Sequence, residues 1–198
     1  MNRVFVVGAL GAAVAVVAGA PVFARSGAAC VYLVEPAHTR VRFSVSQFGL
    51  SDFSGVATGA TGWLKFDPAH PRLSKLDVSV KTATVSTPDK NITGRLRGAE
   101  WLDSARYPTA RFVSNSVTPT SGHRATVRGE LTLRGVTRPV VMYAHFVGLG
   151  GKSATQKDAV RFDGEGAFER AEFGMKALAP MVGDLVHLTI RGAFELRC

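Results

Sequence analysis

Apolar and polar residues alternate one by one in several segments of the chain. In residues 41–45, 76–80, 127–133 and 186–190 the apolar side chains occupy every second position. Successive side chains of a β-strand point to opposite faces, so each segment predicts an antiparallel strand with one dry and one solvated face. Glycine and proline residues separate these segments as turn residues do. About eight strands are expected, at spacings typical of an all-β sandwich or barrel.

One stretch breaks this alternation. Ile92, Leu96, Ala99 and Leu102 recur at intervals of three or four residues, which is helical spacing. The pattern predicts one short helix near residues 90–104, lying across an open end of the sheet. The sequence shows no second domain, no linker and no internal repeat.

The chain begins with an apolar leader. Arg3 precedes an uncharged apolar run over residues 4–20, and small residues flank the end of the segment at Ala24. This layout is typical of a secretory signal peptide over residues 1–24, whose removal leaves a single domain of residues 25–198. A permanent membrane anchor is the alternative, but the run is barely long enough to span and is only weakly apolar. We therefore expect export to the periplasm.

The two cysteines of the chain, Cys30 and Cys198, lie at the two ends of the expected mature domain. An even number in an oxidising compartment favours a disulfide bridge, with two free thiols as the alternative. A bridge would require the first and last strands to be neighbours, as they are in a closed barrel. Loop entropy gives such a bridge about 5 kcal/mol as an upper bound.

Composition excludes several classes of protein. With 46% hydrophobic and 20% charged residues, the chain is not disordered, collagen-like or a coiled coil. The formal net charge of +9 is compatible with transient contact with an anionic membrane surface. Nucleic acid is not expected as a partner, because the arginines fall on solvated strand faces without interleaved aromatic residues.

The residue types needed for catalysis do not form a pattern. The five histidines are scattered, no two of them at the spacing of metal ligands, and neither cysteine has a histidine near it in sequence. A Gly-x-Ser-x-Gly motif is absent from the sequence. Residues 148–151 and 164–166 resemble pieces of phosphate-binding loops, but they lie between strands, where turns explain them. The sequence therefore predicts neither an enzyme nor a bound metal or cofactor.

The inward apolar positions exceed what a small barrel needs to fill itself. An eight-stranded barrel either just fills with side chains or holds one small ligand, and the sequence leaves both open. For each residue alone, an ordinary core position is the simpler interpretation. The candidates for an apolar lining are Phe43, Val45, Phe66, Val78, Val80, Phe112, Leu131, Leu133, Met142, Phe146, Phe162, Phe168, Leu188 and Ile190.

Several strings of the mature chain occur in a characteristic order. They are residues 38–45 (HTRVRFSV), 62–67 (GWLKFD), 99–103 (AEWLD), 107–112 (YPTARF), 129–139 (GELTLRGVTRP), 170–174 (RAEFG) and 182–184 (VGD). Together they resemble the YceI-like family of periplasmic lipid-binding proteins, over roughly residues 31–196. The resemblance implies a lipocalin-like barrel of eight antiparallel strands with a helix near one end, whose interior binds long amphiphiles, notably polyisoprenoids.

We therefore expect an exported carrier that holds a long apolar ligand, such as a polyisoprenoid, an isoprenoid quinone or a similar amphiphile, inside a barrel. The alternative is a structural or stress-linked interaction protein whose barrel is filled by its own side chains. The stretch of residues 91–97 (NITGRLR) departs from the pattern of many relatives, so no head-group contact is carried over to the helix.

Arg170 is the candidate for contact with a polar head group. It shares strand parity with Phe162 and Phe168 and should therefore face the same way. One interpretation places it at the barrel rim, solvated or paired with an acid. The other places it at the mouth of the cavity, where its fork of donors would meet a phosphate, a carboxylate or a quinone oxygen.

Overall fold

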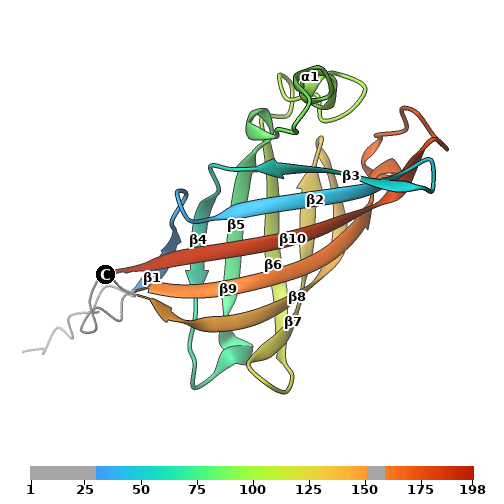
Figure 1. The fold of residues 1–198 in the computed structure, drawn as a ribbon. Coiled ribbons are helices and arrows are strands. Elements are labelled where there is room, and N and C mark those ends of the chain that lie inside the picture. Colours follow the sequence, from blue (N-terminus) through green and yellow to red (C-terminus); the bar gives the residue numbers. More distant parts are fainter. Residues whose placement is uncertain (1–29, 151–158) are drawn as a thin grey trace, which may run out of the picture.

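A computed structural model describes residues 30–150 and 159–198, most of which lie in β-strands (Figure 1). The strands are β1 (Val31–Val34), β2 (Arg40–Gln47), β3 (Ser51–Ala57), β4 (Thr61–Lys65), β5 (Lys75–Lys81), β6 (Thr109–Pro119), β7 (Arg124–Leu133), β8 (Val136–Gly150), β9 (Ala159–Glu169) and β10 (Val182–Arg197). The helices are α1 (Lys90–Arg97) and the 3-10 helices η1 (Pro71–Leu73), η2 (Thr82–Thr84) and η3 (Arg170–Phe173). The predicted signal peptide, residues 1–24, lies outside the described residues.

The strand segments close into a barrel. Neighbours follow the order β1-β4-β5-β6-β7-β8-β9-β10, and β1 pairs with β10 to complete the ring. β2 continues along the same edge of β10, and β3 pairs with β2, all of them antiparallel. Because β1 leads into β2 and β3 into β4, the segments form a closed barrel of 8 strands, two of them interrupted. The predicted eight-stranded antiparallel barrel is confirmed.

Helix α1 lies over one end of the barrel, where a short helix was predicted (Figure 1). Asp89 caps it, because its Oδ1 accepts hydrogen bonds from the backbone N–H groups of Asn91 at 2.7 Å and Ile92 at 3.3 Å. The helix is shorter than expected and ends at Arg97, since the backbone of Gly98 is extended. Among the residues that the structure describes, no helix has the length and apolar character needed to cross a bilayer.

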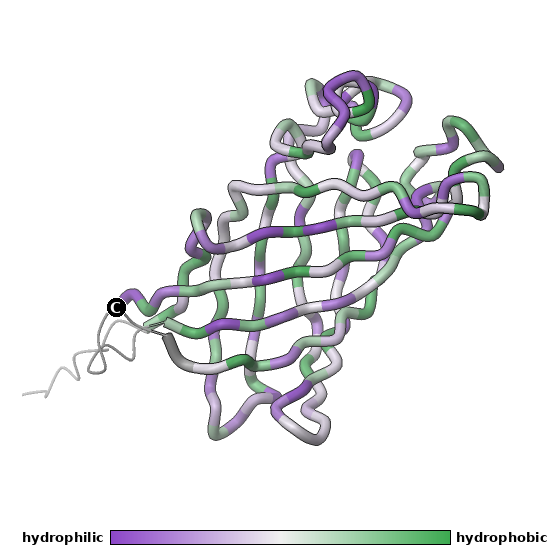
Figure 2. Tube along the Cα trace, viewed as in Figure 1, coloured by the Kyte–Doolittle hydropathy of each residue, from purple (hydrophilic) through white to green (hydrophobic). Residues whose placement is uncertain are grey.

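Alternate side chains along the strands point into the barrel, and Figure 2 shows the matching change between hydrophobic and hydrophilic residues. The buried apolar side chains pack in two clusters rather than one. The first includes Leu131, Met142 and Phe173, and the second includes Val160 and Phe194. Dense packing is therefore divided between two regions of the barrel.

Cys30 and Cys198 form a disulfide bridge, with their Cα atoms 4.2 Å apart. Strand pairing brings the two ends together, because β1 and β10 are antiparallel neighbours from Val31 opposite Arg197 onward. The predicted bridge is confirmed. So is the structural condition that it imposes, that the first and last strands lie side by side.

An ion pair on the outer surface links β5 to β6. Arg111 donates from Nε to Oδ1 of Asp77 at 2.9 Å and from Nη2 to Oδ2 at 2.6 Å, the geometry of a bidentate pair. The hydrogen bonds from Arg111 hold the pKa of Asp77 below its ordinary value of 3.8. Since the folded-state pKa is the lower one, the pair stabilises the fold above about pH 4 and loses this effect as the pH falls through the folded-state pKa.

We expect Asp77→Asn to lower the melting temperature slightly at neutral pH, because Arg111 is 55% exposed and solvent screens the pair. The difference between variant and wild type should shrink as the pH falls below about 4, because the carboxylate is then protonated. Melting curves between about pH 2 and pH 7 measure it. A difference of equal size at both ends of that range would show that Asp77 acts through packing and not through its charge.

Candidate functional site

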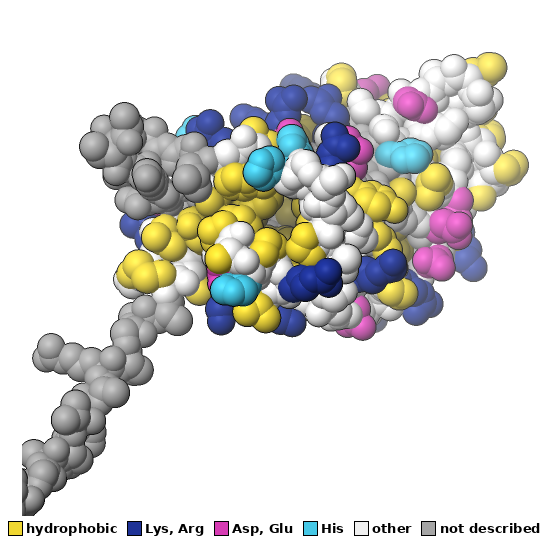
Figure 3. Space-filling view, turned by 90° about the horizontal axis from the view of Figure 1, so that it is seen from below, with side chains coloured by type: hydrophobic (Ala, Val, Ile, Leu, Met, Phe, Trp, Pro, Cys, Tyr) yellow, Lys and Arg dark blue, Asp and Glu magenta, His cyan; other side chains and the backbone are white. Residues whose placement is uncertain are grey.

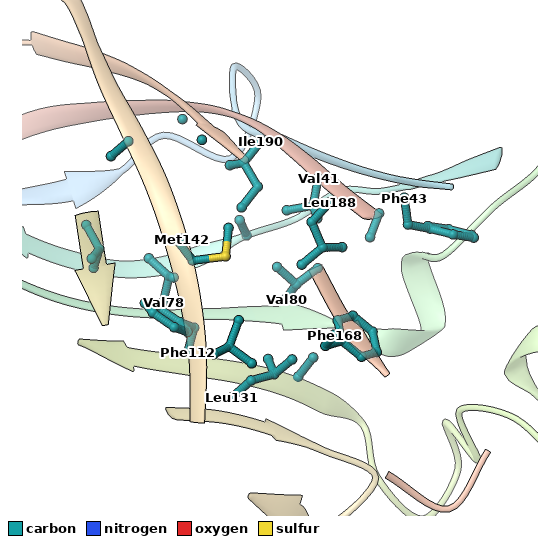
Figure 4. A pocket seen from close by; sticks show the side chains of 18 of the residues that line it. Val41, Phe43, Val78, Val80, Phe112, Leu131, Met142, Phe168, Leu188 and Ile190 are labelled. Atoms are coloured by element: carbon teal, nitrogen blue, oxygen red, sulfur yellow. The ribbon is translucent and has the colours of Figure 1, made fainter. Parts of the chain in front are cut away.

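The barrel encloses a large cavity. Its volume is about 850 Å³, and side chains from several strands point into it (Figure 4). Every side chain predicted from the sequence to face the interior lines this cavity: Phe43, Val45, Phe66, Val78, Val80, Phe112, Leu131, Leu133, Met142, Phe146, Phe162, Phe168, Arg170, Leu188 and Ile190. Their contact with a ligand stays a prediction.

The cavity wall is apolar along the strands and carries charged side chains where strands end. Arg95 and Arg170 belong to the end covered by α1, whereas His123 lies in the turn between β6 and β7 and Arg124 begins β7. Within residues 30–150 and 159–198, no group of three or more His, Cys, Asp or Glu side chains could hold a metal ion. Such a wall can hold a hydrocarbon chain, with basic side chains near its two ends.

Glycines at inward positions contribute to the hollow. Gly129 shares strand parity with Leu131, and a Cβ atom there would lie 2.6 Å from Cζ of Phe112. Likewise, a Cβ atom on Gly166 would lie 2.3 Å from the sulfur of Met142. Because these positions carry no Cβ atom, the side chains of Phe112 and Met142 can occupy that space. The space along the barrel axis therefore stays open.

Sequence reasoning missed part of the lining. Val41, Val127 and Val186 also line the cavity, and strict application of the alternation in their segments would have found them. Leu96 and Trp101 line it from α1 and the turn that follows. No pattern along the sequence indicates that these two side chains meet the barrel interior, because their position depends on how α1 packs.

Aromatic rings gather at the end away from α1. The ring centroids of Phe66 and Phe162 lie 5.2 Å apart, and Phe146 lies 5.7 Å from Phe66 and 5.4 Å from Phe162. The imidazole of His123 lies 6.3 Å from the ring of Phe146. Figure 3 views the molecule from this side and shows hydrophobic side chains around a hollow, with histidine and basic side chains near it. This end of the cavity is thus an apolar, aromatic-lined mouth.

Arg170 is buried, with 2% of its surface exposed, and it uses its guanidinium to hold a loop. Its Nε, Nη1 and Nη2 atoms donate hydrogen bonds to backbone carbonyls, and the indole ring of Trp101 lies over it with the centroid 4.9 Å from Cζ. The acceptors are the carbonyls of Met175, Ala177 at 2.9 Å, Val182 at 2.8 Å and Gly183 at 2.9 Å. Burial lowers the pKa of Arg170, which nearby Asp184 partly offsets.

This geometry corrects the two interpretations of Arg170 drawn from the sequence. The side chain faces the cavity, as its strand parity predicted, but it is neither solvated at the rim nor paired with an acid. Nor are its donors aimed at a ligand, because they already bind four carbonyls of the chain. The sequence could not show this, since strand β9 ends at Glu169 and Arg170 begins η3.

A second arginine joins the same loop to the segment after α1. Arg134 donates from Nη1 to the carbonyl of Gly174 at 2.9 Å and from Nη2 to the carbonyl of Ala99 at 2.6 Å. Together, Arg134 and Arg170 connect the turn after α1 with the loop before β10. These contacts hold the loop before β10 and the turn after α1 in place over the α1 end of the cavity.

Comparison with known proteins agrees with this architecture. Residues 32–194 match the YceI-like domain. A UPF0312 protein of Pseudomonas savastanoi is 36% identical over 146 residues, covering 74% of this chain and 76% of the relative. Protein YceI of Escherichia coli O157:H7 is 34% identical over 142 residues, covering 72% and 73% of the two chains.

Solved structures show the same fold. BcnA of Burkholderia cenocepacia superposes with a TM-score of 0.71 at 24% identity, covering 81% of this chain and 98% of BcnA. A polyisoprenoid binding domain from Saccharophagus degradans superposes with a TM-score of 0.63 at 12% identity, covering 84% and 98% of the two chains. With nearly all of the described barrel inside the matched region, this chain belongs to the YceI-like family.

Proposed function

We propose that this protein is an exported carrier that holds a long apolar amphiphile, such as a polyisoprenoid or an isoprenoid quinone, inside its barrel. The observation that carries the proposal is the cavity of about 850 Å³ that the inward side chains leave open. Ligand pockets in proteins span about 300–1,000 Å³, so the hollow is large enough for a substantial ligand. The structurally similar domain described as polyisoprenoid binding supports the same ligand class.

The chemistry of the wall matches a hydrocarbon chain. Burial of each CH₂ group contributes about 0.8 kcal/mol, so a few isoprene units would supply ample free energy before the cost of ordering them. Phe112, Met142 and Ile190 offer such a ligand apolar surface from three different strands (Figure 4). The ligand needs no hydrogen bonds along its tail, and this stretch of wall supplies none.

The alternatives fit the geometry less well. A structural protein with a self-filled barrel would not retain a hollow of this size. An enzyme acting on a lipid would need polar groups that converge on one point of the cavity. Here the charged side chains of the wall are divided between its two ends, as with Arg95 at the α1 end and Arg124 at the opposite end, and Arg170 uses its donors to bind backbone carbonyls.

Export is supported by two features at the ends of the chain. Residues 1–24 have the layout of a signal peptide, and the domain is closed by the bridge between Cys30 and Cys198. Disulfide bridges persist in oxidising compartments such as the bacterial periplasm. Both features support a periplasmic location.

Organic extraction of the protein, purified from the periplasm of its own source, tests the ligand. Native mass spectrometry should show one amphiphile per chain, and extraction into chloroform and methanol should release it for identification. Protein that carries no stoichiometric amphiphile, and that takes up none from added isoprenoid quinone, would return the barrel to the structural alternative.

Filling the cavity should abolish ligand uptake and leave the fold intact. Val80 of β5 and Leu188 of β10 point toward the same part of the hollow (Figure 4). In Val80→Phe/Leu188→Phe the added rings occupy empty space, so we expect at least a tenfold fall in bound amphiphile with a melting temperature within about 4 °C of wild type. Quantified extraction and thermal melting measure the two effects.

The matched control is Val147→Phe, because Val147 lies on β8 with 54% of its surface exposed to solvent. It adds the same ring outside the barrel and should leave ligand content unchanged. Equal ligand content in the double variant and in this control would contradict the placement of the ligand in the hollow.

A further inference from the structure

Two loops at one end of the barrel lie side by side (Figure 1), and both expose large apolar side chains. We call residues 47–51 and 177–183 together the apolar tip. The N–H of Phe48 in the first loop donates to the carbonyl of Met181 in the second at 2.7 Å. Leu50 is 91% exposed. Neither loop contains a charged residue or a histidine.

Large apolar side chains are exposed on both loops. Phe48 is 62% exposed, Leu178 is 49% exposed and Met181 is 46% exposed. These side chains form a single apolar surface with Leu50, because the backbone hydrogen bond joins the two loops. Exposed apolar patches of this kind mark contact sites for proteins or membranes.

Two of these side chains stand at backbone positions that disfavour them. Phe48 has φ of 54° and Leu178 has φ of 58°, in the left-handed region where glycine, asparagine and aspartate are preferred. Neither side chain is buried in return for this conformation. Phe48 and Leu178 therefore lower local stability without gaining burial. A residue choice that goes against local stability is expected at functional positions.

Several backbone carbonyls of the tip accept hydrogen bonds from within the protein. Arg170 binds the carbonyls of Ala177, Val182 and Gly183 from inside the barrel. The carbonyl of Leu178 accepts from the N–H of Val182 at 2.9 Å. Backbone groups that enter lipid without partners cost several kcal/mol each, so loops with such internal bonds can be immersed at low cost.

The tip is continuous with the cavity. Gln47, Leu178 and Val182 belong to the tip and also line the cavity, and Leu178 is exposed as well. The apolar surface therefore runs from solvent into the barrel at this end. An amphiphile that moves along this surface into the cavity keeps its apolar tail in contact with apolar side chains.

We propose that the apolar tip inserts into the surface layer of a lipid bilayer and thereby opens a path for the ligand between membrane and barrel. The purpose of this contact rests on the proposed carrier function, whereas the contact itself does not. A protein partner fits less well, since protein interfaces carry a polar rim with directed hydrogen bonds. The tip offers no charged side chain for such a rim, and the carbonyls of Ala177, Val182 and Gly183 are already bound by Arg170.

Flotation with vesicles of neutral phosphatidylcholine tests the contact. We expect the wild-type chain to float with the vesicles, and to do so equally at about 50 and 500 mM salt, because the tip contains no charged residue and the residues that flank it, Asp52, Lys176 and Asp184, carry no net positive charge. Phe48→Asn/Leu178→Asn should reduce the bound fraction about tenfold or more. The same variant should melt at or above the wild-type temperature, since asparagine suits the left-handed backbone.

A second measurement places the tip in the lipid. Tryptophan fluorescence of Leu50→Trp should shift to the blue on vesicle addition and be quenched by brominated lipid. The matched control is Leu73→Trp in η1, where Leu73 is 64% exposed and lies between β4 and β5, and it should respond to neither. All variants share the apolar N-terminal segment of the wild type, so differences among them are caused by the tip and not by that segment.

Wild-type protein that does not float, or an asparagine variant that floats like wild type, would overturn the proposal. Binding that requires anionic lipid and disappears at high salt would overturn it too, since charge and not the tip would then carry the contact. Failure of the carrier function is a separate result, because it appears as wild-type protein without an extractable amphiphile.

Discussion

Arg170→Met should destabilise the protein by about 3 kcal/mol or more. The substitution keeps the bulk of the side chain but removes the donors that bind four carbonyls of the loop before β10. Hydrogen bonds from a charged group contribute about 1.5–3 kcal/mol each, and carbonyls left without partners add a desolvation cost. For a domain of this size the loss corresponds to a fall of roughly 10 °C in melting temperature, measured by circular dichroism or calorimetry.

Two further variants separate the loop-holding role of Arg170 from contact with a ligand. Arg170→Lys keeps the charge, but its single ammonium cannot reach four carbonyls at once, so most of the loss should remain. Arg134→Met removes two hydrogen bonds from a more exposed arginine and should cost less. An unchanged melting temperature in Arg170→Met, together with weaker ligand binding, would restore the role of Arg170 as a head-group contact.

Removal of the disulfide should be the second large effect. The double variant Cys30→Ser/Cys198→Ser should lose about 2–4 kcal/mol, because the bridge closes a loop with a sequence separation of 168 and restricts the unfolded chain. The loss should fall below the upper bound of about 5 kcal/mol, since pairing of β1 with β10 already holds the ends together in the folded state. Urea denaturation of oxidised wild type and of the variant measures it.

A reductant supplies the control for this prediction. It should lower the stability of wild type toward that of the double variant, and it should leave the double variant unchanged. Equal stability of oxidised wild type and variant would mean that the strand pairing alone fixes the ends, and the bridge would then have no measurable part in stability.

Much of the fold could be predicted because its determinants are local. The alternation in residues 41–45 or 186–190 depends only on neighbouring positions, so it indicates strands and their inward side chains without knowledge of their partners. The cap at Asp89 is equally local and marks where α1 begins. The predicted ligand-lining residues all face the cavity for this reason.

The ends of elements could not be predicted as well. Helix α1 stops at Arg97 because the chain turns at Gly98, and the turn is held by distant contacts such as that between Arg134 and Ala99. Likewise, nothing next to Arg170 in sequence shows that strand β9 ends before it. Such boundaries depend on packing between segments far apart in the chain.

The sequence by itself determined the class of fold, the inward faces of its strands, the pairing of its two cysteines and its family. Only the tertiary structure decided whether the barrel is hollow, because cavity volume depends on side chains from many strands at once, with Gly129 and Gly166 beneath Phe112 and Met142. It also decided the role of Arg170, whose acceptors lie up to 13 positions away. Periodicity is a property of one segment, whereas volume and buried hydrogen bonding are properties of segments brought together.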